Sequence, residues 1–345
     1  MTKLTYRYRI KDSTSKQILD RWSSKVNYVW NYCKATAIKA WRRDRRCLSG
    51  YDLNYLTSGS SKELGLPAQT IQAICEQFAR SAKQHKKIPR WRSYKKDLGW
   101  VPWKSTSFKM DNDTIVFNGK QLNLWKSRPL GGPVKTGGFA QDARGRWYVC
   151  IVCEVPTEPS NNTKAIGLDL GMKDQIVGSC GTKYTRENLT KQYEIKLADA
   201  QRACKKRQTT NIHQKIKNKR KDWIHKTTTK ICRDYGIVVI GNVSTKQIQK
   251  GKPKGFNRSL YDASWFQLKT TLKYKAQMLG GKYVEVNEAY TTQTCSACFA
   301  RTGPKGTKDL GIREWQCSEC GSFHDRDTNA AQNILRLGHQ TLARA

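Results

Sequence analysis

The sequence lacks the features that carry a chain into or across a membrane. Its apolar runs fall far short of the roughly 20 residues that span a bilayer. Its first residues, MTKLTYRYRIKD, are polar and basic, unlike a secretory signal. No internal repeat is evident, and the glycine-rich stretch Gly131–Gly138 lacks the Gly-Lys-Ser/Thr order of a phosphate-binding loop and predicts a flexible turn. We therefore expect a soluble intracellular protein.

Acidic residues are scarce. Asp and Glu number 27 against 64 Lys and Arg, so the 345-residue chain has a formal net charge of +37. Such an excess costs self-repulsion and favours a polyanionic partner, with nucleic acid first because lysine and arginine contacts to phosphate release counterions. The alternatives are a ribosomal-type structural protein and a basic surface that only aids solubility. The 11 Trp and 15 Tyr suit stacking on bases, although most should lie in the core.

The twelve cysteines do not predict disulfides, because no secretory signal precedes them. Four of them form two Cys-x-x-Cys pairs separated by 18 residues: Cys295, Cys298, Cys317 and Cys320. This spacing predicts a zinc ribbon with a closed, structural Zn²⁺ site, in which Gly321 allows a tight turn and His324 is not needed as a ligand. Cys150 and Cys153 have a similar spacing but fall in a predicted strand, where residues three apart face opposite sides, so we interpret them as structural thiols.

The first 160 residues or so predict a small helical module and then a β-rich region. Lys3–Ile10 alternates like a strand, and a helical stripe begins at Ser13. A second helix is expected to open near Leu66-Pro67. From about residue 88 to residue 159 the signals are β, including a hairpin that turns at Asn118-Gly119.

The second half predicts a mixed sheet flanked by helices. A buried strand at Ala165–Leu170 precedes two short strands, a long basic helical stretch from Glu194 to Tyr235, and an apolar strand in GIVVIGNVS. A helix through Trp265–Met278, the strand KYVEVNE and a last helix in RDTNAAQNILRLG complete the series. This order, βββ–α–β–α–β–α, is that of the ribonuclease H-like fold.

Acidic side chains at particular places in this fold would let it hydrolyse a phosphodiester, because carboxylates gather the two hard cations that the reaction needs. Asp169 interrupts the apolar run IGLDLG, where a buried charge is costly unless it is paired or bound to metal. Asp327 stands at the start of the last helix, where Ala330 and Ala331 allow close packing on the sheet. Asp325 is interpreted as a capping or solvent residue.

The middle acid is missing from its usual place. It should end the fourth strand, IVVIGNVS, but Gly241 and Asn242 stand there. Taken alone, this position predicts a site that has lost one metal ligand.

Three motifs together resemble the transposon-encoded TnpB (OrfB) family, the ancestors of the type V CRISPR effectors: IGLDLG, the ribbon TCSAC…CSECG, and HDRDTNAAQNIL. The YRYRI strand and the VNYVWNYC helix are also similar, more loosely. The resemblance implies an RNA-guided DNA endonuclease. A guide RNA pairs with one strand of double-stranded target DNA, the protein recognises a short motif flanking the target, and a Mg²⁺-dependent RuvC-like Asp-Glu-Asp centre cuts. It further implies a cytoplasmic, nucleoid-associated prokaryotic protein that acts as a monomer or homodimer.

The resemblance also implies a division into four parts. Residues 1–10 and 88–160 would form a wedge β-barrel, residues 11–87 a helical recognition lobe, residues 161–292 and 323–345 the RuvC-like nuclease domain, and residues 293–322 the zinc ribbon. The expected fold class is therefore α/β plus a β-barrel and a helical module. Five basic residues are expected to contact nucleic-acid phosphates, although each could equally belong to a solvated helix face: Lys205, Lys206, Arg207, Lys219 and Arg220.

Relatives without the middle acid are either natural nuclease-dead repressors or carry the glutamate on the neighbouring strand. In this fold the fifth strand lies beside the fourth, and matching ends are about 5 Å apart. Glu288, just beyond this strand, could therefore reach the same metal, whereas Glu285 lies mid-strand and should face solvent or a covering helix. We predict that Asp169, Glu288 and Asp327 hold Mg²⁺. The alternative functions are a nuclease-dead RNA-guided DNA-binding repressor and a DNA-only resolvase or transposase.

Overall fold

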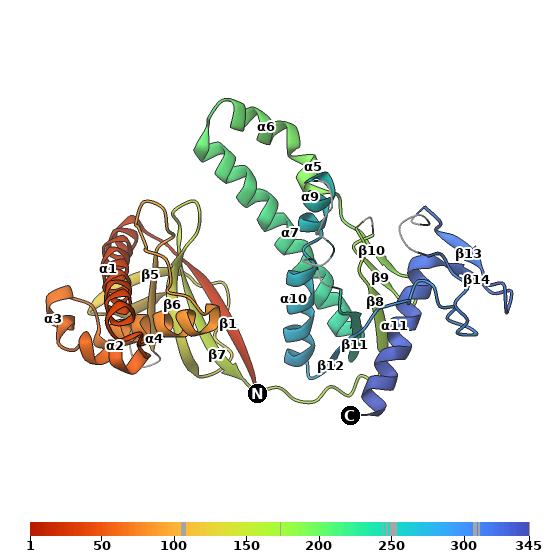
Figure 1. The fold of residues 1–345 in the computed structure, drawn as a ribbon, viewed down its shortest axis with the longest axis horizontal. Coiled ribbons are helices and arrows are strands. Elements are labelled where there is room, and N and C mark those ends of the chain that lie inside the picture. The colour runs from red at the N-terminus through yellow and green to blue at the C-terminus, as the bar shows by residue number, and fades with distance from the viewer. Residues whose placement is uncertain are drawn as a thin grey trace. The chain divides into compact units, whose positions relative to one another are not determined.

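The chain forms two compact units, which are described separately (Figure 1). A computed structural model describes residues 1–104, 108–172, 174–243, 245, 248, 254–305, 309 and 311–344. The first unit ends at Pro156 and the second begins at Thr157. Among all the residues that the structure describes, no helix is both long enough and apolar enough to cross a membrane. The finer four-part division stays a prediction.

A curled seven-stranded sheet forms the centre of the first unit, in the order β2-β6-β7-β1-β5-β4-β3. Its strands are β1 (Thr2–Ile10), β2 (Trp100–Lys104), β3 (Phe108–Asp111), β4 (Thr114–Phe117), β5 (Lys120–Trp125), β6 (Val134–Gln141) and β7 (Trp147–Val155). β4 and β5 form the predicted hairpin, in which Asn118 and Gly119 have φ values of 50° and 69°. Within the described strands β2 and β3 are the two ends of this sheet, so the predicted barrel is here a curled sheet.

The glycine-rich stretch Gly131–Gly138 is not the flexible turn that the sequence predicted. Its second half begins β6, which pairs with β2 on one side and β7 on the other. A Cβ atom at Gly137 would lie 2.4 Å from the Cys150 carbonyl oxygen and 2.6 Å from the ring of Trp103. Trp103 is only 1% exposed. Glycine is needed in this strand because the indole fills the space that a side chain would take.

Among the described residues of this unit, the sheet is accompanied by the helices α1 (Ser13–Asp44), α2 (Gly50–Leu56), α3 (Ser60–Leu64) and α4 (Ala68–His85). α1 and α4 carry the apolar stripes that the sequence predicted, and Trp30 of α1 meets Phe78 of α4 edge to face with ring centroids 5.1 Å apart. The sequence analysis missed α2 and α3, which are short. α2 begins with a capping box, in which Ser49 and Asp52 each bond the other's backbone N–H.

The second unit contains a five-stranded mixed sheet in the order β10-β9-β8-β11-β12. Its strands are β8 (Ala165–Asp169), β9 (Ile176–Gly178), β10 (Lys183–Tyr184), β11 (Ile237–Gly241) and β12 (Lys282–Val286). β8, β11 and β12 run parallel, whereas β9 and β10 continue the sheet as an antiparallel meander. The fifth strand lies beside the fourth, as predicted. This order and these directions confirm the ribonuclease H-like fold.

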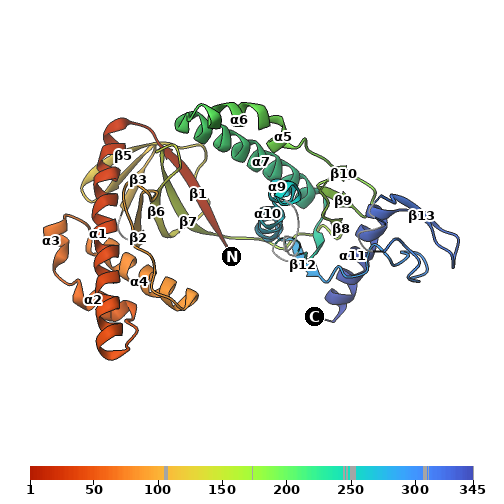
Figure 2. The same ribbon diagram turned by 45° about the horizontal axis from the view of Figure 1, so that its top comes forward.

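The remaining elements of this unit are α5 (Leu189–Gln192), α6 (Glu194–Arg202), α7 (Lys206–Asp234), α9 (Lys254–Ala263), α10 (Trp265–Met278), the hairpin β13 (Glu314–Gln316) and β14 (Phe323–Asp325), and α11 (Arg326–Ala343). The long basic stretch is therefore two helices, because the chain turns back between α6 and α7 (Figure 2). Cys204 adopts a positive φ of 51° in this turn.

Different helices cover the two faces of the five-stranded sheet (Figures 1 and 2). Successive side chains of a strand point to opposite faces. Ile166, Leu168, Val238 and Ile240 share a buried cluster with side chains of α7 and α10. Val239 and Val286 instead pack with Ile334 of α11. By the same alternation Gly167, Asp169 and Gly241 lie on the face that α11 covers.

α11 approaches the sheet so closely that side chains are excluded at two places. A Cβ atom at Gly167 of β8 would lie 2.1 Å from the Ala331 carbonyl oxygen, and one at Gly338 of α11 would lie 2.4 Å from the Val239 methyl carbons. Ala330 and Ala331 are fully buried, as the sequence predicted from their small size. The small residues set the distance between the helix and the sheet.

Gly167→Ala should therefore destabilise the fold, because the added methyl group meets backbone that cannot move aside. We expect a loss of about 1–3 kcal/mol in the free energy of unfolding, measured by urea denaturation. Gly311→Ala is the matched control, since no atom of the residues that the structure describes lies within 4 Å of its Cβ position; it should change stability by less than about 0.5 kcal/mol. Equal stability of the two variants would contradict the close packing.

Candidate functional site

Asp169 is the last residue of β8 and faces α11 at the carboxyl end of the strand. Its side chain is half-buried. Burial, and after it the negative charges of Asp327 and Glu288, raise the pKa of Asp169 to about 7. The three acids predicted from the sequence therefore lie close enough to act on one another electrostatically.

The Glu288 carboxylate occupies the space of the side chain that Gly241 lacks. A Cβ atom built on Gly241 would lie 1.7 Å from Glu288 Oε2 and 2.8 Å from its carboxyl carbon. Gly241 ends β11 and pairs with Val286, the last residue of β12. Glu288 follows two residues later, so it continues the alternation of Val284 and Val286 toward α11. Any larger residue at position 241 would displace this carboxylate.

Burial also raises the pKa of Glu288, against the opposing influence of Lys269 and of a hydrogen bond with the Val243 backbone. Lys269 lies on α10 with its side chain 12% exposed. Its Nζ donates to the Val243 carbonyl at 3.0 Å and lies 4.0 Å from Glu285 Oε2. The Tyr283 hydroxyl donates to Glu285 at 2.9 Å. Glu285 thus faces the covering helix α10, which is one of the two environments predicted for it. The sequence analysis missed the role of Lys269.

Asp327 lies in the first turn of α11 and Asp325 caps that helix. Asp325 accepts a hydrogen bond from the Thr328 backbone N–H at 2.8 Å, and its carboxylate forms an ion pair with Lys183 of β10 at 3.2 Å. This agrees with the capping role predicted for it. Asp327 Oδ2 accepts from Arg313 Nη1 at 3.1 Å. Arg313 precedes β13, and nothing in the sequence pattern had indicated this pair.

The carboxylate oxygens of the three acids do not form a group as tightly spaced as the cysteine sulfurs. Among the described residues, the four cysteines are the one group whose metal-ligating atoms all lie within 4.8 Å of one another. Like charges repel in a poorly solvated site unless a cation lies between them. Asp169, Glu288 and Asp327 therefore lie near one another at one face of the sheet, within electrostatic reach.

The four cysteine sulfurs form a cluster that fits a structural zinc ion. Cys295 Sγ lies 3.7 Å from Cys320 Sγ, and Cys298 Sγ lies 3.6 Å from Cys317 Sγ. Tetrahedral zinc with bonds of about 2.3 Å holds its sulfur ligands about 3.8 Å apart. The four ligands come from protein alone, which is typical of a closed structural site.

Both cysteine pairs have the same backbone geometry. Cys295 N–H donates to the Ala300 carbonyl and Cys317 N–H donates to the Ser322 carbonyl, five residues ahead in each case. The residue after each second cysteine is left-handed, with φ values of 67° at Phe299 and 71° at Gly321. The tight turn predicted at Gly321 is present. Two equivalent knuckles therefore present the sulfurs symmetrically.

Two asparagines of α11 hold the segment that leads into the ribbon against this helix. Asn329 and Asn333, both 1% exposed, each donate to the carbonyls of Thr291 and Thr294 at 2.7–3.3 Å. Asn329 also accepts from the Ser296 backbone N–H at 2.8 Å. They hold the segment that links Glu288 to the first knuckle. The sequence analysis missed them, although two asparagines four residues apart on one helix face were a readable signal.

The basic residues predicted to contact nucleic acid lie in two different environments. Lys205, Lys206, Arg207 and Lys219 are exposed at the start and along the surface of α7. Arg220 instead donates to Asp262 at 2.6 Å, and Asp262 is 3% exposed. Arg186 bonds the same carboxylate at 3.2 Å. Arg220 therefore helps to hold α7 against α9, whether or not it also meets a phosphate.

The raised pKa of Asp169 has a consequence for stability. The folded chain binds this proton more tightly than the unfolded chain, so stability should fall as pH rises from about 3.9, the ordinary value, to about 7. Without divalent cations, Asp169→Asn should raise the free energy of unfolding by about 1–3 kcal/mol near pH 8 and little near pH 4. The exposed Asp113→Asn is the control. A stability gain that is the same at both pH values would contradict this origin.

The cysteine cluster predicts one bound zinc ion per chain. Cys317→Ser should lose that ion and the order of the ribbon, measured by metal analysis and by limited proteolysis after Phe299. Cys180→Ser, which changes an exposed cysteine outside the cluster, should keep the full zinc content. Retention of zinc by Cys317→Ser would exclude the cluster as the metal site.

Comparison with protein families matches two parts of the chain. Residues 148–251 match a family described as a probable transposase, OrfB_IS605. Residues 265–334, which include β12, the cysteine cluster and the start of α11, match the Cas12f1-like TNB domain. The two matches together cover most of the second unit.

Several curated proteins are similar in sequence. A Streptomyces pristinaespiralis protein named "Putative RNA-guided DNA endonuclease" is 29% identical over 333 residues, covering 91% of this chain and 78% of that protein. InsQ of Escherichia coli K12, which carries the same description, is 30% identical over 63% of this chain and 60% of its own length. TnpB-like protein L79 of Acanthamoeba polyphaga mimivirus is 28% identical over 61% of this chain and 45% of its own length.

Two solved structures match over most of their length at low TM-scores. A chain from a Cas12f1–sgRNA–target DNA complex has a TM-score of 0.37 and 15% identity, covering 97% of this chain and 99% of that one. A chain from a CRISPR–Cas12f ternary complex has a TM-score of 0.38 and 12% identity, covering 92% of this chain and 81% of that one. By its sequence the chain is therefore similar to the OrfB_IS605 family of probable transposases and to the Cas12f1-like TNB domain, and over most of its length to a relative named as a putative RNA-guided DNA endonuclease.

Proposed function

We propose that this protein is an RNA-guided DNA endonuclease whose centre consists of Asp169, Glu288 and Asp327. The relatives named as RNA-guided DNA endonucleases support the guided reaction on DNA. The net charge of +37 supports a protein that holds long polyanions. The partners would be a guide RNA and a double-stranded target DNA, with a monomer or homodimer as the acting species.

The observation that carries this proposal is the fit between Gly241 and Glu288. The position where the fold would place its middle acid has no side chain, and the carboxylate of Glu288 fills that volume from the neighbouring strand. Loss of a ligand by mutation would leave a gap there or an unrelated side chain. The filled volume therefore favours a relocated glutamate over a lost one.

The donor set fits Mg²⁺, which prefers carboxylate oxygens and is bound through few protein ligands. Divalent ions held by these three residues would lower the pKa of a bound water and neutralise charge on the scissile phosphate. The chain's own contribution is placement. Asp169 and Glu288 project from parallel strand ends, and Asp327 projects from α11, whose start is fixed by the Asp325 cap and by Lys183.

The exposed residues Lys205, Lys206, Arg207 and Lys219 would contact the phosphate backbone rather than bases. Their charge would then set affinity and salt dependence without altering sequence choice. Arg220 differs from them, because its ion pair with Asp262 gives it a structural role as well.

Two other functions remain alternatives. A nuclease-dead RNA-guided DNA-binding repressor would need the same fold and charge but no metal at the three acids. A DNA-only resolvase or transposase would need no guide, so RNA that copurifies after expression with the native flanking DNA would argue against it. Bound but uncut target DNA would favour the repressor.

A swap of side chains between positions 241 and 288 tests the proposal. Glu288→Ala should reduce guided cutting of a matched duplex by about 100-fold or more, the scale of losing one group that stabilises the transition state. Gly241→Glu alone should also reduce cutting, because it collides with Glu288. The double variant Gly241→Glu/Glu288→Ala should recover much of the activity, because the carboxylate returns to the vacated volume from the other strand.

Glu285→Ala is the control for the swap, since Glu285 faces α10 rather than the proposed centre; it should cut like the unchanged protein. The proposal fails if Glu288→Ala cuts undiminished while Asp169→Ala does not cut at all. It also fails if the double variant is no more active than Glu288→Ala while binding target DNA normally.

A further inference from the structure

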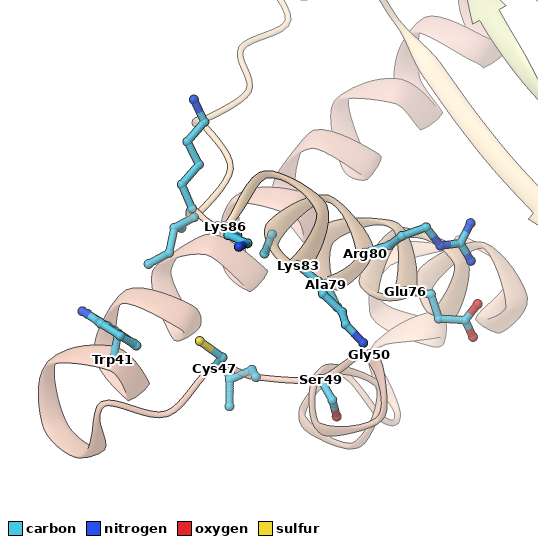
Figure 3. Close-up of a pocket in the computed structure, with 13 residues that line it drawn as sticks. Trp41, Cys47, Ser49, Gly50, Glu76, Ala79, Arg80, Lys83 and Lys86 are labelled. Carbon is cyan, nitrogen blue, oxygen red and sulfur yellow. The ribbon is translucent and has the colours of Figure 1, made fainter.

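A cavity of about 1020 Å³ lies in the first unit (Figure 3). One wall comes from the end of α1 and the segment that follows it, including Trp41 and Cys47, and the other comes from α4 and the residues after it. Its volume is at the upper end of the range of small-molecule sites. Nothing in the proposed nuclease chemistry uses it.

The cavity has an aromatic and apolar interior. Leu48, Ala79 and Ile88 contribute half-buried aliphatic surface. Trp41 lines the cavity and keeps 42% of its surface exposed. The Arg45 guanidinium lies over this ring, 5.8 Å from its centroid. The exposed remainder of the indole offers apolar surface on which a base can stack.

The rim of the cavity is strongly basic. Arg80, Lys83, Lys86 and Lys87 are exposed and line it. Glu76 is the one acid among its described lining residues, and Lys104 of β2 pairs with that carboxylate at 2.9 Å. The rim therefore presents a net positive charge beside an aromatic wall. A ligand that satisfies both must combine an anionic group with a flat ring system.

We propose that this cavity takes one unpaired nucleotide of a bound single-stranded nucleic acid. The base would stack on Trp41 against the aliphatic wall, and the neighbouring phosphates would lie among Arg80, Lys83 and Lys86. Stacking tolerates every base, so the site would bind strand rather than sequence. The proposal rests on the proposed function only for the presence of a nucleic-acid partner.

Cys47 allows the cavity to be tested directly, because its thiol is exposed and lines it. The rate of Cys47 alkylation by iodoacetamide, measured by mass spectrometry on the full chain without added Mg²⁺, should fall about tenfold or more when a single-stranded oligonucleotide saturates the protein. The exposed Cys180 in the second unit is the internal reference and should react at an unchanged rate. Single-stranded RNA and DNA arms distinguish the two sources of the nucleotide.

Duplex DNA and polyglutamate complete the set of ligands. Neither should protect Cys47, because a paired base cannot enter the cavity and a polyglutamate has no ring to stack. Equal protection by polyglutamate would show a general anion site and overturn the proposal. So would an unchanged Cys47 rate with an oligonucleotide whose binding is established by fluorescence anisotropy, and so would an absence of oligonucleotide binding.

Two variants separate stacking from charge. Trp41→Ala should shift the midpoint of Cys47 protection by about 5- to 150-fold, the loss expected for one stacked base, and Lys83→Glu should also weaken protection. Trp125→Ala is the matched control, because Trp125 is an exposed tryptophan of the same unit outside the cavity and 57% exposed; it should leave the midpoint unchanged. Guided DNA cutting is measured separately. Protection of Cys47 without cutting would contradict only the proposed nuclease function, and cutting without protection of Cys47 would contradict only the nucleotide site.

Discussion

α11 can lie on the five-stranded sheet only because two glycines leave room for its backbone. Gly167 brings β8 against the carbonyl of Ala331, and Gly338 brings the helix against Val239. This close contact sets the distance between the helix and that face of the sheet. The start of α11 places Asp327 toward the end of β8, and Asn329 and Asn333 carry the segment between Glu288 and the first cysteine knuckle. A longer distance between helix and sheet would separate the acids and detach the ribbon.

The same reliance on an absent side chain recurs at Gly241. In a sheet, the position of a functional group is set by its strand, its register and the face to which it points. Glu288, two residues beyond the end of β12, lies on the same face as Gly241, the last residue of β11. A carboxylate on the longer glutamate side chain can therefore replace one from the neighbouring strand, provided that the neighbour is glycine. This is a general route by which an active site can keep its geometry while its residues change strand. Under the proposed function, a site that looks incomplete in the sequence would therefore be complete in space.

Much of this could be predicted from the sequence, because the signals were local. The succession of strands and helices in the second unit followed from hydrophobic periodicity, the order of the strands in the sheet followed from the fold that this succession indicated, and the cysteine spacing alone located the cluster. The roles of Asp325 and of the two alanines on α11 also followed from their position at a helix start. The packing of glycines could not be predicted in this way: Gly137 looked like part of a turn but lies in β6 against Trp103. Lys269, Arg313 and the Arg220–Asp262 pair depend on contacts between distant segments, which no local pattern encodes.

The central claim is that Glu288 replaces the missing acid as a metal ligand. Anomalous diffraction from crystals grown with Mn²⁺ in place of Mg²⁺ measures this directly. The account predicts manganese bound by carboxylate oxygens of Asp169, Glu288 and Asp327 at about 2.0–2.3 Å. Manganese held by Asp169 and Asp327 with Glu288 turned away, or no manganese at these residues in crystals soaked to saturation, would contradict it.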